Sequence, residues 1–149
     1  MRSIAPLGLT PHLFVRGADE AVRFYIAAFA ATELFRNALP DGRVIFIELV
    51  IGPARLLVSE ETPSLGALAP PSVGGSPMLL LLEVDDPDET VKRAIGAGGT
   101  EEMPVEEMFW GERYGVVRDP FGHRWAISTA RQEFTPDDIA SHTPSEAGW

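Results

Sequence analysis

The chain repeats a short pattern of residues at an offset of 69 positions, and this repeat is the strongest constraint on its fold. Residues 15–23 (VRGADEAVR) and residues 84–92 (VDDPDETVK) share Val, Asp, Glu, Val and a basic residue in the same order. Gly52 and Gly122, 70 positions apart, each separate two apolar stretches. Two matches in the same order at nearly the same offset indicate two copies of one module.

Local signals predict that each copy consists of a strand, a helix and three further strands. Acidic residues begin each predicted helix, Asp41-Gly42 is typical of a hairpin turn, and Gly98-Gly99 ends the second helix. The strands are expected at 10–15, 33–39, 43–51, 55–58, 78–84, 100–103, 114–117 and 124–129, and the helices at 19–31 and 88–97. The sequence therefore predicts an α+β fold made of two βαβββ modules.

The chain is expected to be a single domain with a module on each side of a linker. The first module spans about 8–60, and the second spans about 78–130. Residues 61–77 are rich in Pro, Gly and Ser, which is typical of a linker without regular structure. The tail, 131–149, is expected to contain a short helix that begins at Thr135-Pro136.

Composition excludes several classes of function. The 149 residues include no cysteine, so disulfides, thiol nucleophiles and Cys-ligated metals are excluded. The net charge of −10 disfavours nucleic acid and anionic membranes as partners, and it is compatible with a cationic ligand, although solubility is the simpler explanation. No apolar run approaches the length of a membrane span, and we therefore expect the protein to be cytoplasmic.

Glu48 is an unusual residue in a strand that is otherwise apolar. Alternation along 43–51 places Glu48 on one face with Phe46, so the carboxylate faces either an open, wet groove or a partner or metal. His12 lies on the open face of the first strand, and it is expected either to approach Glu48, as a general base or half of a metal site, or to form a hydrogen bond within the groove.

The second module offers further candidates for ligand binding. Phe109 and Trp110 lie in a predicted loop beside Tyr114, and together they are expected to form an aromatic lip against which a ligand stacks. Glu83 lies near a strand end, where solvent satisfies a carboxylate easily. Trp125 is expected in a core or an interface.

The remaining polar residues of this module are interpreted as structural. Surface ion pairs are expected for Arg113, Arg118 and Arg124. Residues 119–122 are expected to form a simple turn. His123 is expected outside the cavity, and no role is assigned to His142.

The sequence resembles a known superfamily. The strings TPHLFVRGADEAVRFY (10–25), PDGRVIFIEL (40–49), GGSPMLLLLEVDD (74–86) and FWGERYGVVRDPFGHRWAIS (109–128) are similar to the vicinal oxygen chelate superfamily. This superfamily includes glyoxalases, bleomycin-resistance proteins and dioxygenases, and the resemblance is greatest to its PhnB-like type. The resemblance implies curled sheets around a concave groove, usually completed in a homodimer.

The resemblance also implies where a metal would be bound. Enzymes of the superfamily hold a divalent ion through His and Glu side chains from four strands, and those positions fall on Thr10, Glu48, Leu79 (or Leu81, with a shift of two) and Ala126. Only Glu48 is a metal ligand, whereas a catalytic site needs about three protein ligands. We therefore expect no metal cofactor.

Two functions are compatible with these observations. The first is a metal-independent binder of a small organic molecule, with a cationic antibiotic as one ligand class that the charge and the aromatic residues suggest. The alternative is a divalent-metal-dependent lyase, isomerase or dioxygenase that uses His12 and Glu48. Both hypotheses expect a homodimer, because open curled sheets leave edges and apolar surface exposed.

Overall fold

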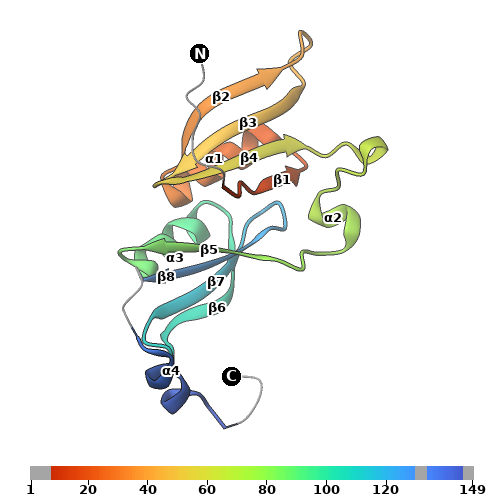
Figure 1. The fold of residues 1–149 in the computed structure, drawn as a ribbon. Coiled ribbons are helices and arrows are strands. Elements are labelled where there is room, and N and C mark those ends of the chain that lie inside the picture. Colours follow the sequence, from red (N-terminus) through yellow and green to blue (C-terminus); the bar gives the residue numbers. More distant parts are fainter. Residues whose placement is uncertain (1–7, 130–133, 146–149) are drawn as a thin grey trace.

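The computed structural model describes residues 8–129 and 134–145 and shows two successive βαβββ modules (Figure 1). Residues 131–133 and 146–149 of the predicted tail lie outside the described residues. The first module contains β1 (His12–Val15), α1 (Ala18–Phe29), β2 (Thr32–Ala38), β3 (Val44–Ile51) and β4 (Ala54–Glu60). The second contains β5 (Leu79–Val84), α3 (Pro87–Gly96), β6 (Thr100–Glu107), β7 (Arg113–Arg118) and β8 (Arg124–Thr129).

Each module forms one mixed four-stranded sheet. The strand orders are β1-β4-β3-β2 and β5-β8-β7-β6, in which the β1–β4 and β5–β8 pairs are parallel and the other pairs are antiparallel. The registers repeat as well, since His12 pairs with Leu57 and Leu81 pairs with Ala126. The predicted α+β fold is confirmed, and β4 is the counterpart of β8.

Two segments contain more regular structure than the sequence predicted. The linker forms a short 3₁₀ helix, η1 (Pro63–Leu65), and one helical turn, α2 (Pro70–Val73), each with proline in its first turn. Strand β6 extends to Glu107, well beyond the predicted 100–103, because an edge strand with register irregularities tolerates Pro104.

The tail helix forms as expected. Helix α4 (Pro136–His142) begins with a capping box in which the side chains of Thr135 and Asp138 each accept a hydrogen bond from the other's backbone N–H. No helix among the described residues is long and apolar enough to cross a membrane.

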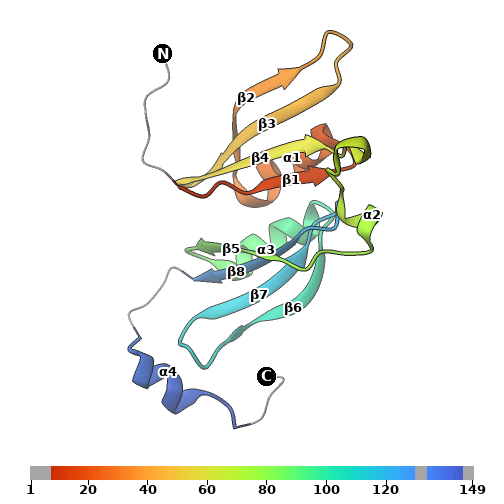
Figure 2. The same ribbon diagram turned by 45° about the vertical axis from the view of Figure 1, so that its right-hand side comes forward.

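The hydrophobic core joins the two modules through their helices. Helix α1 buries Val22, Tyr25 and Phe29 and packs against α3, and both helices lie against the sheets as Figure 2 shows. Trp125 on β8 is 3% exposed and contacts the rings of Tyr25 and Phe29. Trp125 is therefore a core residue, which is one of the two places that the sequence predicted for it.

The hairpin between β7 and β8 fastens the second module to the first. Asp119 was interpreted as a simple turn residue, but its carboxylate is buried and bonded to Tyr25 of α1 and to Trp125. Nε2 of His123 donates a hydrogen bond of 2.9 Å to the carbonyl oxygen of Phe14 on β1. These contacts fix the relative position of the two sheets.

Candidate functional site

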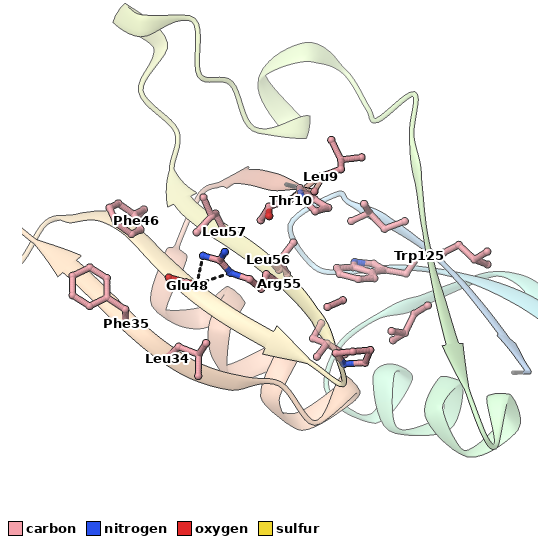
Figure 3. Close-up of a pocket in the computed structure, with 18 of the residues that line it drawn as sticks. Leu9, Thr10, Leu34, Phe35, Phe46, Glu48, Arg55, Leu56, Leu57 and Trp125 are labelled. Atoms are coloured by element: carbon pink, nitrogen blue, oxygen red, sulfur yellow. Dashed lines mark hydrogen bonds and ion pairs between the residues drawn. The ribbon is translucent and has the colours of Figure 1, made fainter. Parts of the chain in front are cut away.

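A large apolar cavity lies between the two modules and is open to solvent (Figure 3). Its volume is about 1390 Å³. The first module contributes the segment 8–11 that precedes β1, residues of β3 and β4, and part of β2. The second module contributes β5 and the indole of Trp125. Its lining includes Thr10, Phe35, Phe46, Glu48, Arg55 and Trp125.

Strand alternation explains why this face is apolar. Leu56 and Val58 of β4 are buried, whereas Leu57, between them, is less buried and lines the cavity, and Leu56 reaches the same lining. On β2 and β3 the rings of Phe35 and Phe46 lie 5.7 Å apart at the edge of the cavity. A planar apolar ligand therefore meets aromatic surface at this end.

Glu48 and Arg55 form an ion pair within the cavity wall. Nε of Arg55 donates a hydrogen bond of 2.7 Å to Oε1 of Glu48, and Nη2 contacts the same oxygen (Figure 3). The Glu48 side chain is 11% exposed and that of Arg55 is 43% exposed. The two residues come from adjacent strands of the hairpin that turns at Gly52-Pro53, with Glu48 paired to Leu57.

This pair identifies an ionic partner for Glu48, which the sequence analysis left open, and Arg55 is a site residue that it missed. A signal for Arg55 was present in the sequence. Arg55 lies near the start of β4, just after the turn, and alternation places it on the same face as Leu57. Leu57 pairs with Glu48, and Arg55 pairs with Val50, so Arg55 lies diagonally across from Glu48.

His12 does not reach Glu48. A hydrogen bond of 2.7 Å joins its Nε2 to Oγ of Ser59 on β4, and its ring contacts that of Phe14. Strand β4 lies between β1 and β3, so the backbones that carry His12 and Glu48 are about 9–10 Å apart. Partial burial lowers the pKa of His12. The histidine therefore forms a hydrogen bond with the neighbouring strand, and neither His12 nor Ser59 lines the cavity.

The sheet registers correct one position of the implied metal site. Ala126 lies on β8, whose counterpart is β4, whereas Glu48 lies on β3. Leu57 pairs with His12 in the first module, and Ala126 pairs with Leu81 in the second. His12 and Leu81 are 69 positions apart, and so are Leu57 and Ala126, so Leu57 is the equivalent of Ala126. The four ligand positions are then Thr10, Leu57, Leu79 (or Leu81, with a shift of two) and Ala126.

A metal does not fit this donor set. Three of the four side chains are hydrocarbon, and a threonine hydroxyl alone does not hold a catalytic divalent ion. Within 8–129 and 134–145, no three His, Cys, Asp or Glu side chains are grouped to bind a metal ion. The residues present therefore do not support a metal at the superfamily's usual place.

The predicted aromatic lip lies elsewhere in the molecule. Trp110 contacts Phe109 and Tyr114 edge to face, with ring centroids 4.9 and 5.3 Å apart, in a cluster at the β6–β7 connection. Neither these three residues nor Glu83 line the cavity, whereas Phe46 and Glu48 do. The loop that carries Phe109 and Trp110 is shorter than predicted, because β6 pairs with β7 up to Glu107.

The arginines of the second module are paired on the surface as expected. Arg113 contacts Asp88 and Glu107, and Arg118 and Arg124 both contact Glu102. His123 lies outside the cavity lining and bonds to β1, and His142 ends α4. These residues contribute to structure rather than to the candidate site.

Comparisons with known proteins agree with the fold. Residues 4–127 match the model of the Glyoxalase/Bleomycin resistance protein/Dioxygenase superfamily. The protein Rv0887c of Mycobacterium tuberculosis is 38% identical over 141 residues, which cover 93% of this chain and 83% of that protein.

Solved structures are also similar. A gene product from Arabidopsis thaliana has a TM-score of 0.66 and 27% identity, covering 83% of this chain and 99% of the other. TioX from Micromonospora sp. ML1 has a TM-score of 0.65 and 23% identity, covering 87% and 100%.

Proposed function

Since the chain belongs to the glyoxalase/bleomycin resistance protein/dioxygenase superfamily, we propose that it is a metal-independent binder of a small organic molecule. The observation that carries this proposal is the cavity between the modules, which combines apolar walls with the Glu48–Arg55 ion pair. Small-molecule sites are mostly apolar concavities with a few polar groups that orient the ligand. Thr10, Glu48 and Arg55 supply those groups here.

The charges of the cavity bear on the class of ligand. The net charge of −10 favours the approach of a cation, so a cationic antibiotic is one of the ligands to be tested. Within the cavity, however, Glu48 is already paired with Arg55, and a ligand cation has to displace this guanidinium or bind beside it. This pairing favours a ligand without a positive charge at that point.

The metal-dependent lyase, isomerase or dioxygenase remains the alternative function, and the side chains offer it little support. His12 is bonded to Ser59 and is separated from Glu48 by an intervening strand. A general base formed by these two residues needs hydrogen-bond reach, which the sheet geometry prevents.

We also propose that the chain is a homodimer. Within the described residues, β1 and β5 are edge strands of their sheets, and large apolar side chains are exposed on β2 and β5, among them Phe35 at 52% and Leu81 at 52%. The cavity exceeds the usual range of about 300–1,000 Å³ for small-molecule sites. A second copy would cover this apolar surface and narrow the cavity.

Calorimetric titration of chelator-stripped protein tests the proposed function. The probes are prodan, a neutral naphthalene ketone whose emission shifts to the blue in apolar surroundings, and bleomycin, a cationic antibiotic. Saturable binding of prodan without added metal, with one site per cavity, is the expected result. If neither probe binds at high micromolar protein, the binder hypothesis is contradicted.

A further inference from the structure

Arg55 is placed to do more than neutralise Glu48. An arginine side chain has five N–H donors, in a planar fork. The contacts with Glu48 engage Nε and one N–H of Nη2. The remaining donors, including both on Nη1, have no hydrogen-bond partner among the described residues, and the side chain is 43% exposed toward the cavity. A charged donor group therefore faces an otherwise apolar cavity.

Glu48 fixes the direction of these donors. The Glu48 side chain is 11% exposed, and its carboxylate contacts Nε and Nη2 on one edge of the guanidinium. The long arginine side chain is therefore held in one orientation before a ligand binds. Such preorganisation lowers the entropy cost of binding. The pair also sets the electrostatics, because its two charges offset each other and it supplies the charged side chains among the described residues that line the cavity.

The surroundings of Arg55 limit what a ligand can be. Phe46 and Phe35 lie on one side of the guanidinium and Trp125 lies on the other in the view of Figure 3. Apart from the ion pair and Thr10, the walls are hydrocarbon or aromatic. A ligand that fits both features is apolar and planar and carries an oxygen acceptor, without a charge that would disturb the neutral pair.

We propose that Arg55 is the specificity-determining residue of the cavity, and that it selects uncharged aromatic molecules bearing a carbonyl-type oxygen. This inference rests on the proposed function, because it names the ligand class of the same cavity. The ligand oxygen accepts a hydrogen bond from the free edge of the guanidinium, while its ring packs beside Phe46 and Phe35.

The test compares two probes in matched variants. Prodan carries a ketone, and in its propyl analogue a methylene group replaces that ketone. Both are titrated into wild type, Glu48→Gln and the double variant Glu48→Gln/Arg55→Met, with circular dichroism melts to verify folding. The two variants share the substitution Glu48→Gln, so their difference reports Arg55 alone and leaves no carboxylate unpaired.

For each protein, the affinity for prodan is divided by the affinity for the propyl analogue. This ratio should be at least about tenfold higher in Glu48→Gln than in the double variant, because a hydrogen bond from a charged donor contributes about that much. Wild type should show at least the ratio of Glu48→Gln, since its guanidinium is held in place. Arg43→Met, on the surface beside Asp41, is the control and should leave the ratio unchanged.

Two other outcomes are distinguishable. If both probes bind and the ratio is the same with and without Arg55, the cavity is a binding site but the role of Arg55 is overturned. If neither probe binds to any of the proteins, the proposed function fails, and the selection by Arg55 fails with it. A ratio in wild type that is lower than the ratio in the double variant also contradicts the proposal.

Discussion

The hydroxyl group of Tyr25 donates a hydrogen bond of 2.6 Å to Oδ2 of Asp119, 94 positions away in the sequence. The same oxygen accepts a hydrogen bond of 3.0 Å from the indole of Trp125. Oδ1 accepts from the backbone N–H groups of Phe121 and His123. One buried carboxylate thus joins helix α1 of the first module to the β7–β8 hairpin of the second, and so helps to position both walls of the cavity.

Replacing Tyr25 with Phe should destabilise the protein by about 1.5–3 kcal/mol, because a buried carboxylate loses a charged hydrogen bond while the ring packing stays. Urea unfolding followed by circular dichroism measures this change. The control is Tyr114→Phe, at a half-buried residue, which should change the free energy of unfolding by no more than about 0.5 kcal/mol. Equal effects of the two substitutions would contradict the role given to the Tyr25–Asp119 bond.

Stability should fall in alkali because of the same tyrosine. Burial first, and then the neighbouring Asp119, raise the pKa of Tyr25 well above its ordinary value. Below pH of about 10 both folded and unfolded chains keep this proton, and its contribution to stability is fully present. Above that pH the unfolded chain releases the proton and the folded chain holds it. The free energy of unfolding therefore falls by about 1.4 kcal/mol per pH unit until the folded pKa is reached.

Urea titrations between about pH 8 and pH 11 compare wild type with Tyr25→Phe. Burial also raises the pKa of Tyr114, so some loss of stability in alkali should remain in the variant. The difference between the two proteins isolates Tyr25. Parallel pH profiles would show that Tyr25 does not resist ionisation in the folded state.

The repeat made the fold predictable, because the same local signals occur twice and only a few topologies use a βαβββ unit in tandem. The candidate site was predicted less well. Phe46 and Glu48 were identified because strand alternation is a local property that fixes which face a side chain occupies. The position of the Trp110 cluster depends on how far β6 pairs with β7, and the edge strand's irregular register is set by tertiary contacts.

The same distinction explains Arg55 and His12. Which strand lies between two others is a matter of sheet order, and β4 lies between β1 and β3 although it is last in the module. The sequence places His12 and Glu48 on open faces but cannot state that a whole strand separates them. Arg55 pairs with Glu48 because the two lie in adjacent strands, and that becomes apparent only once the register is known.

Divalent metals should not stabilise the protein. A site filled at about 100 times its dissociation constant adds roughly 2.7 kcal/mol to the free energy of unfolding, which a thermal melt detects easily. Leu57, Leu79 and Ala126 supply no ligand atoms, so melts of chelator-stripped protein with manganese, iron(II), cobalt, nickel or zinc should coincide with the metal-free melt. A shift of several degrees that is lost in His12→Ala would instead support the metal-dependent alternative.

Two aromatic substitutions distinguish the cavity from the Trp110 cluster. Phe46→Ala should weaken prodan binding about threefold to tenfold, because it removes ring packing worth about 0.5–1.5 kcal/mol beside the ligand. Trp110→Ala should leave the affinity unchanged, since Trp110 does not line the cavity. Calorimetric titration of both variants with prodan shows whether the ligand binds in the cavity or at the Trp110 cluster. A loss of affinity in Trp110→Ala alone would move the ligand to the β6–β7 connection.

The state of association is the last prediction. With 16.2 kDa per chain, light scattering at tens of micromolar should report about twice that mass. Leu81→Lys should shift the mass toward that of one chain, because Leu81 is 52% exposed on edge strand β5 and a buried ammonium without a partner is costly in an apolar interface. The control is Leu65→Lys, at a residue 81% exposed in η1, which should remain dimeric. A wild-type mass of one chain would contradict the homodimer, and a dimeric Leu81→Lys variant would show that β5 is not part of the interface.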